Sequence, residues 1–178
     1  MSSRVRPGTT GVRARGAALP IVLLISSMML TTAAAWFDTS LAAARAARNI
    51  AGHVSAFHAA DSMLRVCARA VLSGAATVVA GTPGVTTEPV AWKSSATFDS
   101  RAVSSFAASS ASWPGTAKPP QCVAETWQIA GRPSVRGYLL TARGYGQSED
   151  IQAWLQLQLA VDGDQVERHW RRIASRPF

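Results

Sequence analysis

The feature that most constrains this chain is the run from Ala17 to Phe37, which contains no charged side chain. About 21 residues in a helix, at 1.5 Å each, span about 30 Å, the thickness of the hydrocarbon core of a bilayer. Four arginines precede the run and Asp38 follows it. Because positively charged flanks stay in the cytoplasm, the run predicts a single membrane span with the rest of the chain on the far side.

Three interpretations of this N-terminus remain open. The run could be a plain anchor, or the core of a secretory signal that is cleaved after Ala35 and releases a soluble protein. It could also follow a prepilin-type leader, a polar basic segment of residues 1–16 that ends in Gly16. Cleavage between Gly16 and Ala17 would then leave the whole apolar segment, residues 17–37, on the mature protein.

Residues 38–74 predict a helix that continues the apolar run without a break signal. The segment has no proline up to Ser73 and is rich in alanine, arginine, leucine and methionine, which favour helices. Apolar residues recur at three- and four-residue steps and predict one buried face: Ile50, Val54, Phe57, Leu64, Ala68 and Val71. Gly74 follows the last of them and fits a helix C-cap. A secretory signal should instead end in a turn or an extended cleavage site, so the prepilin interpretation is favoured.

Three stretches resemble one protein family. Residues 15–24 (RGAALPIVLL) resemble the start of PilX-type minor pilins of type IV pili, and of the related K-type pseudopilins of type II secretion. Residues 56–64 (AFHAADSML) and 138–146 (YLLTARGYG) resemble two further motifs of these pilins, on the helix and on a strand. Together the stretches cover less than a quarter of the chain, in the family's order. The matching motif residues are Phe57, Ala60, Asp61, Thr141, Ala142, Arg143 and Gly144.

The resemblance implies a minor pilin that joins a tip complex and starts pilus assembly, with an interaction role and no catalysis. Its implied partners are prepilin peptidase, the inner membrane, other minor pilins, the major pilin and a tip adhesin. Major pilins carry a glutamate at the fifth mature position, where this chain has Ile21. An unpaired carboxylate in hydrocarbon costs a few kcal/mol, so its absence suits a subunit with no neighbour above it. The alternative of a K-type pseudopilin shares this gap, but that family usually carries a larger inserted domain.

The remainder of the chain predicts an α+β, pilin-like fold, with the long N-terminal helix packed on a C-terminal antiparallel sheet. Residues 75–121 are a loop-rich segment with one possible edge strand at 89–92, and residues 94–120 are rich in serine and alanine. Residues 122–178 predict four strands, at 122–130, 136–143, 153–161 and 166–173, with a tight turn at Asp162-Gly163. We expect Leu157, Leu159, Val161, Leu139 and Val123 to face the helix.

The two cysteines are Cys67, late in the helix, and Cys122, which opens the first predicted strand. Their number is even, and the inferred compartment is oxidising. We therefore expect a disulfide, closing a loop of about 55 residues and worth roughly 4 kcal/mol in the chain-entropy model. The alternative is two free buried thiols.

Composition argues against several other classes of function. The net charge is +8, but four of the arginines lie before the apolar run and the others are dispersed. A nucleic-acid-binding protein would concentrate its cations in a patch, so no nucleic-acid partner is expected. No phosphate-binding loop, nucleophile elbow or metal-ligand motif is present, so we expect no cofactor, metal or catalytic residues. The acidic pairs Glu149-Asp150 and Asp162/Asp164 leave a calcium loop open as an alternative.

Overall fold

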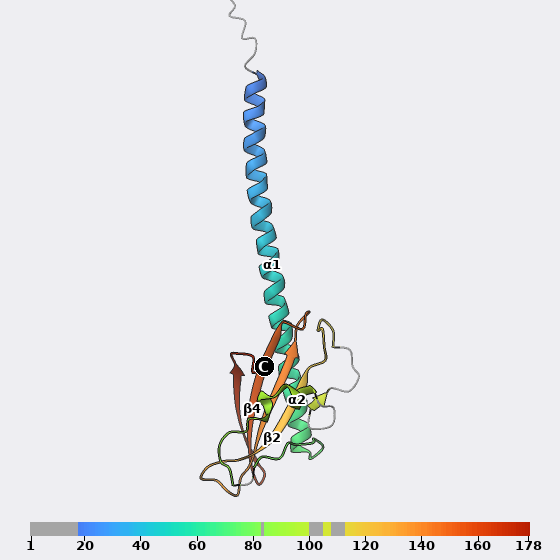
Figure 1. Cartoon of the computed structure of the whole chain (residues 1–178), viewed down its shortest axis with the longest axis vertical. Coiled ribbons are helices and arrows are strands. Elements are labelled where there is room, and N and C mark those ends of the chain that lie inside the picture. Colours follow the sequence, from blue (N-terminus) through green and yellow to red (C-terminus); the bar gives the residue numbers. More distant parts are fainter. Residues whose placement is uncertain (1–17, 83, 100–104, 108–112) are drawn as a thin grey trace, which may run out of the picture. The chain divides into compact units, whose positions relative to one another are not determined.

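The computed structural model describes residues 18–82, 84–99, 105–107 and 113–178 (Figure 1). The chain divides into two compact units, residues 1–46 and 47–178. The described part of the first unit, residues 18–46, is wholly helical and belongs to helix α1 (Ala18–Leu72). The second unit holds the end of α1 and all the strands, and it is called the head below.

Helix α1 forms and ends as its sequence predicts. Pro20 lies in the first turn, where a missing N–H costs nothing because that group has no partner within the helix. At the other end, Gly74 takes a φ of 74°. The N–H of Ala75 donates to the carbonyl of Ala70 at 2.9 Å, and that of Gly74 donates to Val71 at 3.1 Å. This is a Schellman ending, so the C-cap prediction is confirmed.

The head contains a five-stranded antiparallel sheet in the order β1-β2-β3-β4-β5. The strands are β1 (Ser105–Ala107), β2 (Gln121–Gln128), β3 (Arg136–Tyr145), β4 (Gln152–Asp162) and β5 (Gln165–Ile173). The last four are the predicted strands, with ends that differ by one or two residues. The predicted α+β fold, a long helix packing on an antiparallel sheet, is therefore confirmed, and β1 is an additional strand that sequence patterning missed.

The predicted edge strand at residues 89–92 is wrong. This segment instead leads into a short 3₁₀-helix, η1 (Ala91–Lys93), and then into helix α2 (Ser95–Asp99). The reason is the carboxylate of Glu125, which accepts hydrogen bonds from the backbone N–H groups of Ala91 at 2.8 Å and Trp92 at 3.2 Å. A side chain on β2 thus takes up the donors that a strand ladder would have used.

The head has two apolar clusters, one on each face of the sheet. On the α1 face, Met63, Leu64 and Cys67 of the helix pack with side chains of β2, β3 and β4, among them Leu155 and Leu159. On the opposite face, here called the outer face, the buried residues are Trp92, Phe98, Val123, Leu139 and Trp154.

The core prediction is therefore correct in part. Leu157 and Leu159 pack on the α1 face as expected. Val123 and Leu139 lie on the outer face, and Val54 is 49% exposed. Adjacent leucines at positions 139 and 140 occupy opposite faces of β3, and hydrophobicity alone cannot tell which of two such neighbours faces the helix. The helix itself buries mainly small residues at Gly52, Ala56 and Ala60, which a search for large apolar side chains passes over.

Candidate functional site

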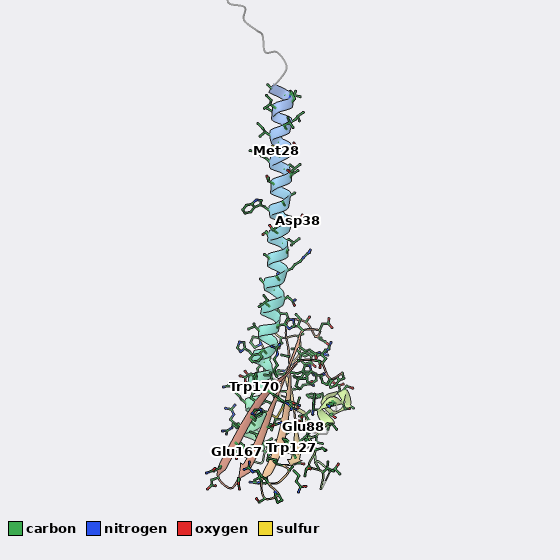
Figure 2. All side chains as sticks on the ribbon, turned by 90° about the vertical axis from the view of Figure 1, so that its left-hand side faces the viewer. Met28, Asp38, Glu88, Trp127, Glu167 and Trp170 are labelled. Carbon is green, nitrogen blue, oxygen red and sulfur yellow. A yellow bond between two sulfur atoms is a disulfide. The ribbon has the colours of Figure 1, made fainter. Side chains whose placement is uncertain are left out.

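The first candidate element is the apolar segment of α1. Helix α1 is the one described helix that is long and apolar enough to cross a membrane. Its large side chains between Leu19 and Phe37 are all exposed, including Ile21 at 53% and Met28 at 67% (Figure 2). The hydroxyl of Thr31 donates to the carbonyl of Met28 at 2.9 Å, so this polar group is satisfied within the helix. The segment is compatible with a single membrane span. The expected processing residues, Gly16 and Ala17, lie outside the described residues.

The second candidate element is a close contact between the two family motifs in the head. Gly144 of β3 lies directly against the backbone of α1 at Ala56 and Ala60. A Cβ at Gly144 would lie 2.5 Å from the backbone nitrogen of Ala60, and one at Gly146 would lie 2.6 Å from the carbonyl oxygen of Gly52. Only glycine at these two positions, at the end of β3 and just after it, therefore permits this spacing between helix and strand. The structure brings Ala60 and Gly144 together, which neither motif predicts by itself.

The other helix motif residues are half-buried. The ring of Phe57 meets that of Trp170 on β5 edge to face, with centroids 6.2 Å apart. Asp61 forms an ion pair with Arg65 at 3.1 Å, one helical turn away, and the arginine side chain is exposed to water. An i, i+4 pair of this kind contributes little to stability.

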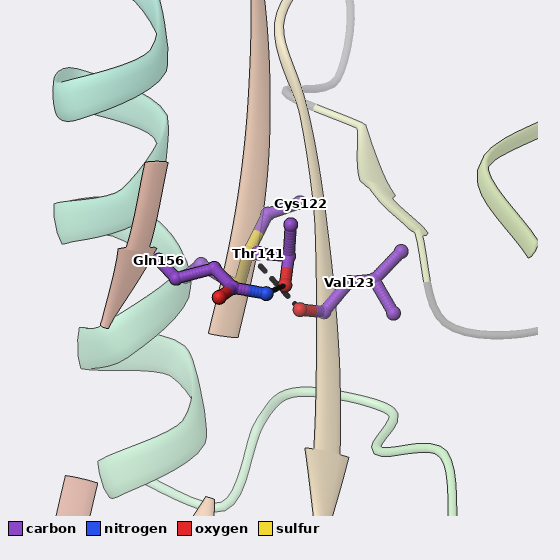
Figure 3. Close-up of a disulfide and its surroundings, with 5 residues drawn as sticks. Cys122, Val123, Thr141 and Gln156 are labelled. Carbon is purple, nitrogen blue, oxygen red and sulfur yellow. Dashed lines mark hydrogen bonds between the residues drawn. A yellow bond between two sulfur atoms is a disulfide. The ribbon is translucent and has the colours of Figure 1, made fainter. Parts of the chain in front are cut away.

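The strand motif divides between the two faces of β3. Ala142 belongs to the α1-face cluster. Thr141 points to the outer face, where its hydroxyl accepts a hydrogen bond from the side-chain amide of Gln156 at 2.9 Å (Figure 3). Gln156 in turn accepts a bond from Arg171 at 2.7 Å, and Arg171 pairs with Glu88. This chain of contacts ties the segment before η1 to β5 and leaves the buried Gln156 satisfied.

Arg143 is enclosed on the outer face. Its side chain is 8% exposed and donates to the side-chain oxygen of Gln121, with Asp99 at 3.4 Å. Four aromatic rings surround its guanidinium, with centroids 5.1 to 5.4 Å from the central carbon: Phe98, Tyr145, Trp154 and Phe178. A guanidinium over ring faces gains cation–π attraction that increases when water is excluded. The register places Trp154 of β4 opposite Arg143. The arginine therefore packs β3 against Phe178, and we interpret its role as structural.

The predicted disulfide is confirmed. Cys67 of α1 and Cys122 of β2 are bonded, and both residues are fully buried (Figure 3). The bond spans 55 positions of sequence and links the helix to a strand of the sheet. It also closes a covalent loop around the loop-rich segment between the two cysteines. The disulfide therefore links the helix to the sheet covalently across this segment.

The described residues contain no group of three or more His, Cys, Asp or Glu side chains that could hold a metal. Glu149, one of the acids considered for calcium, pairs with Lys118, and this hydrogen bond raises the pKa of the lysine. A groove of about 500 Å³ lies between residues 79–91 and strands β2 and β3. Its one buried carboxylate, Glu125, is occupied by the N–H groups of η1, and burial raises its pKa.

The described residues thus show an exposed apolar helical segment and a head that a disulfide links internally. Comparisons with protein-family models, with curated proteins and with solved structures find no match for this chain.

Proposed function

We propose that this chain is a minor pilin that joins the tip complex initiating a type IV pilus. The observation that carries the proposal is the continuity of α1 from an exposed apolar segment into a helix packed on an antiparallel sheet. A subunit of this plan can leave the bilayer only by exchanging lipid contacts for contacts with the apolar helices of other subunits. That exchange is the physical requirement of a helical fibre drawn from a membrane.

Two features support the pilin interpretation over a secreted protein cleaved after Ala35. Residues 33–36 are helical, whereas a peptidase needs extended backbone at its cleavage site. The contact of Gly144 with Ala56 and Ala60 joins two of the three stretches on which the family resemblance rests. Ile21 supports a place at the tip, because it leaves no carboxylate to pair with a neighbour's N-terminal amine.

The test is processing, followed by pilus assembly. In cells, the mature protein should begin at Ala17, as read by intact mass after membrane extraction, and Gly16→Asp should leave the leader attached. Deleting the gene should sharply reduce surface pili while the major pilin persists in the membrane. A mature N-terminus at Trp36 would establish the secreted alternative. Loss of protein secretion with normal pili would establish the pseudopilin alternative.

Copy number separates the tip from the shaft. Blotting of sheared pili should find few copies of this protein per fibre. Ile21→Glu should not increase its incorporation greatly, because no subunit above it supplies an amine. A stoichiometry close to that of the major pilin would overturn the tip assignment.

A further inference from the structure

The two edges of the sheet are treated differently. At one edge, β1 pairs with residues 121–123 of β2. Beyond it, the backbone of Val79 covers β2 by bonding to Ala124 at 2.8 Å and Thr126 at 2.9 Å. At the other edge, β5 is the last strand of the sheet (Figure 1). It pairs with β4 over its full length, and no described backbone group bonds to its free side. The free side of this 9-residue strand leaves its backbone groups without partners, and such an edge is a template for another strand.

The α1-side face of β5 carries a distinct alternating pattern. Trp170 contacts Phe57 of α1, so the residues two positions before and after it, Arg168 and Arg172, lie on the same face. All three are exposed, Trp170 at 46%. Neither Arg168 nor Arg172 has an ion-pair partner among the described residues, in contrast to Arg171, which pairs with Glu88. The edge thus presents an aromatic side chain flanked by two free cations.

We propose that the free edge of β5 binds an extended acidic segment of a different protein subunit, which adds to the sheet as a further antiparallel strand. The complementary segment carries acidic residues four positions apart with an apolar residue midway, to meet Arg172, Trp170 and Arg168. Backbone hydrogen bonds supply the attachment, and the cross-strand charge pairs supply the specificity. The inference rests on the proposed function in one respect: the partner is another subunit of the same assembly.

A second copy of this chain does not fit the same edge. No two of its ten acidic residues stand four positions apart, so it cannot supply the complementary pattern. Pairing two β5 strands would also bring their unpaired arginines to within the spacing of neighbouring strands, about 4.8 Å, where like charges repel. The arginines therefore act against self-association and favour a heterologous partner.

The test is site-specific crosslinking in cells that make the full chain. A photoreactive amino acid replaces His169, an exposed residue in the middle of β5, and the crosslinked peptides are identified by mass. We expect a crosslink to an acidic segment of another membrane-anchored subunit. Arg168→Glu with Arg172→Glu should reduce its yield about tenfold, because two attractive cross-strand pairs become repulsive. Reversing the two acidic residues on the partner should restore it.

The matched control is Arg136→Glu with Arg176→Glu, the same charge change at two exposed arginines outside β5. It should leave the crosslink unchanged. Complete formation of the Cys67–Cys122 disulfide shows that a variant folds. If the variant with Arg168→Glu and Arg172→Glu does not fold, Arg168→Gln with Arg172→Gln takes its place. A crosslink to a second copy, a segment without the acidic pair, equal loss in the control, or no crosslink would overturn the inference. If Gly16 processing and pilus counts behave as proposed in the same cells, only the inference about β5 fails.

Discussion

The two faces of the head's sheet each bury an apolar cluster, but they differ in how closely their backbones pack and in how they treat polar groups. The α1 face is apolar and close: small residues at Gly52, Ala56 and Ala60 let the helix backbone approach β3, and a disulfide closes the far end. The outer face buries polar groups, Arg143, Gln156 and Glu125, each with a partner. The close approach of helix and strand on the first face depends on small side chains, whereas the burial of polar groups on the second depends on hydrogen-bond partners. The two faces should therefore fail in different ways.

The largest effect should come from the disulfide on the α1 face. Cys67→Ala with Cys122→Ala should lower the free energy of unfolding of the head by about 4 kcal/mol, because the unfolded chain regains the freedom of a long loop. Urea unfolding of the full chain in detergent micelles, followed by tryptophan fluorescence, measures this. Reduced wild-type protein is the control and should match the variant. Equal stability of oxidised and reduced protein would show that the helix and β2 are held by packing alone.

Arg143 should give the next effect, on the outer face. Arg143→Met keeps the apolar stem but leaves the Gln121 oxygen without its donor and removes the charge from the four rings. We expect a loss of about 3 kcal/mol. Arg143→Lys should recover only part of it, because an ammonium cannot stack flat on rings and bond to Gln121 together. Full recovery by lysine would mean that charge alone matters there. The same urea titration distinguishes these outcomes.

Gly144→Ala should cost about 2 kcal/mol, because the added methyl meets the backbone of α1 and the helix must move away. Gly131→Ala is the control: it adds a methyl in open space but at a φ of 75°, so it should cost about 1 kcal/mol from backbone strain. If both variants lose the same free energy of unfolding, the close approach of helix and strand makes no specific contribution to stability. Thermal unfolding of the two variants in parallel makes the comparison.

The sequence predicts those features that follow from local rules. The helix from Ala18 to Leu72, its glycine cap and the four strands 121–173 follow from residue propensity, turn chemistry and alternation. The disulfide follows from the even number of cysteines and from the oxidising compartment that the sequence predicts. These features depend on residues close in the sequence or, for the disulfide, on the number of cysteines.

Features that depend on distant partners could not be predicted in this way. The 3₁₀-helix at Ala91 exists because Glu125, 34 positions away, captures its N–H groups. The facing of Leu139 depends on α2 and η1 covering the outer face, which nothing in the strand itself reveals. Arg143 looks like a surface arginine until the register sets Trp154 beside it. The sequence did carry one signal of the close helix contact, the two glycines at positions 144 and 146. Glycine in or beside a strand often marks a place where another backbone approaches closely.

The smallest expected effect concerns how the stability of the head depends on pH. Burial raises the pKa of Glu125, so between the ordinary glutamate pKa and this raised value the folded state binds more protons than the unfolded state. Its contribution to stability is therefore present at low pH and is lost as the pH rises through the raised pKa. At exposed Glu167, a hydrogen bond from Arg132 lowers the pKa, so its contribution is lost as the pH falls through the lowered value.

Glu125→Gln and Glu167→Gln should therefore shift the pH dependence of stability in opposite directions. Relative to wild type, Glu125→Gln should be least stable at acidic pH and should recover toward neutrality, where the wild type bears a buried charge. At pH 7 the difference should stay within about 1 kcal/mol, because glutamine keeps one of the two bonds to η1. Glu167→Gln should approach wild type as the pH falls. Urea midpoints between pH 3 and pH 8 measure both. Parallel profiles for the two variants would show that the polar groups of the outer face are no more shielded from water than an exposed ion pair.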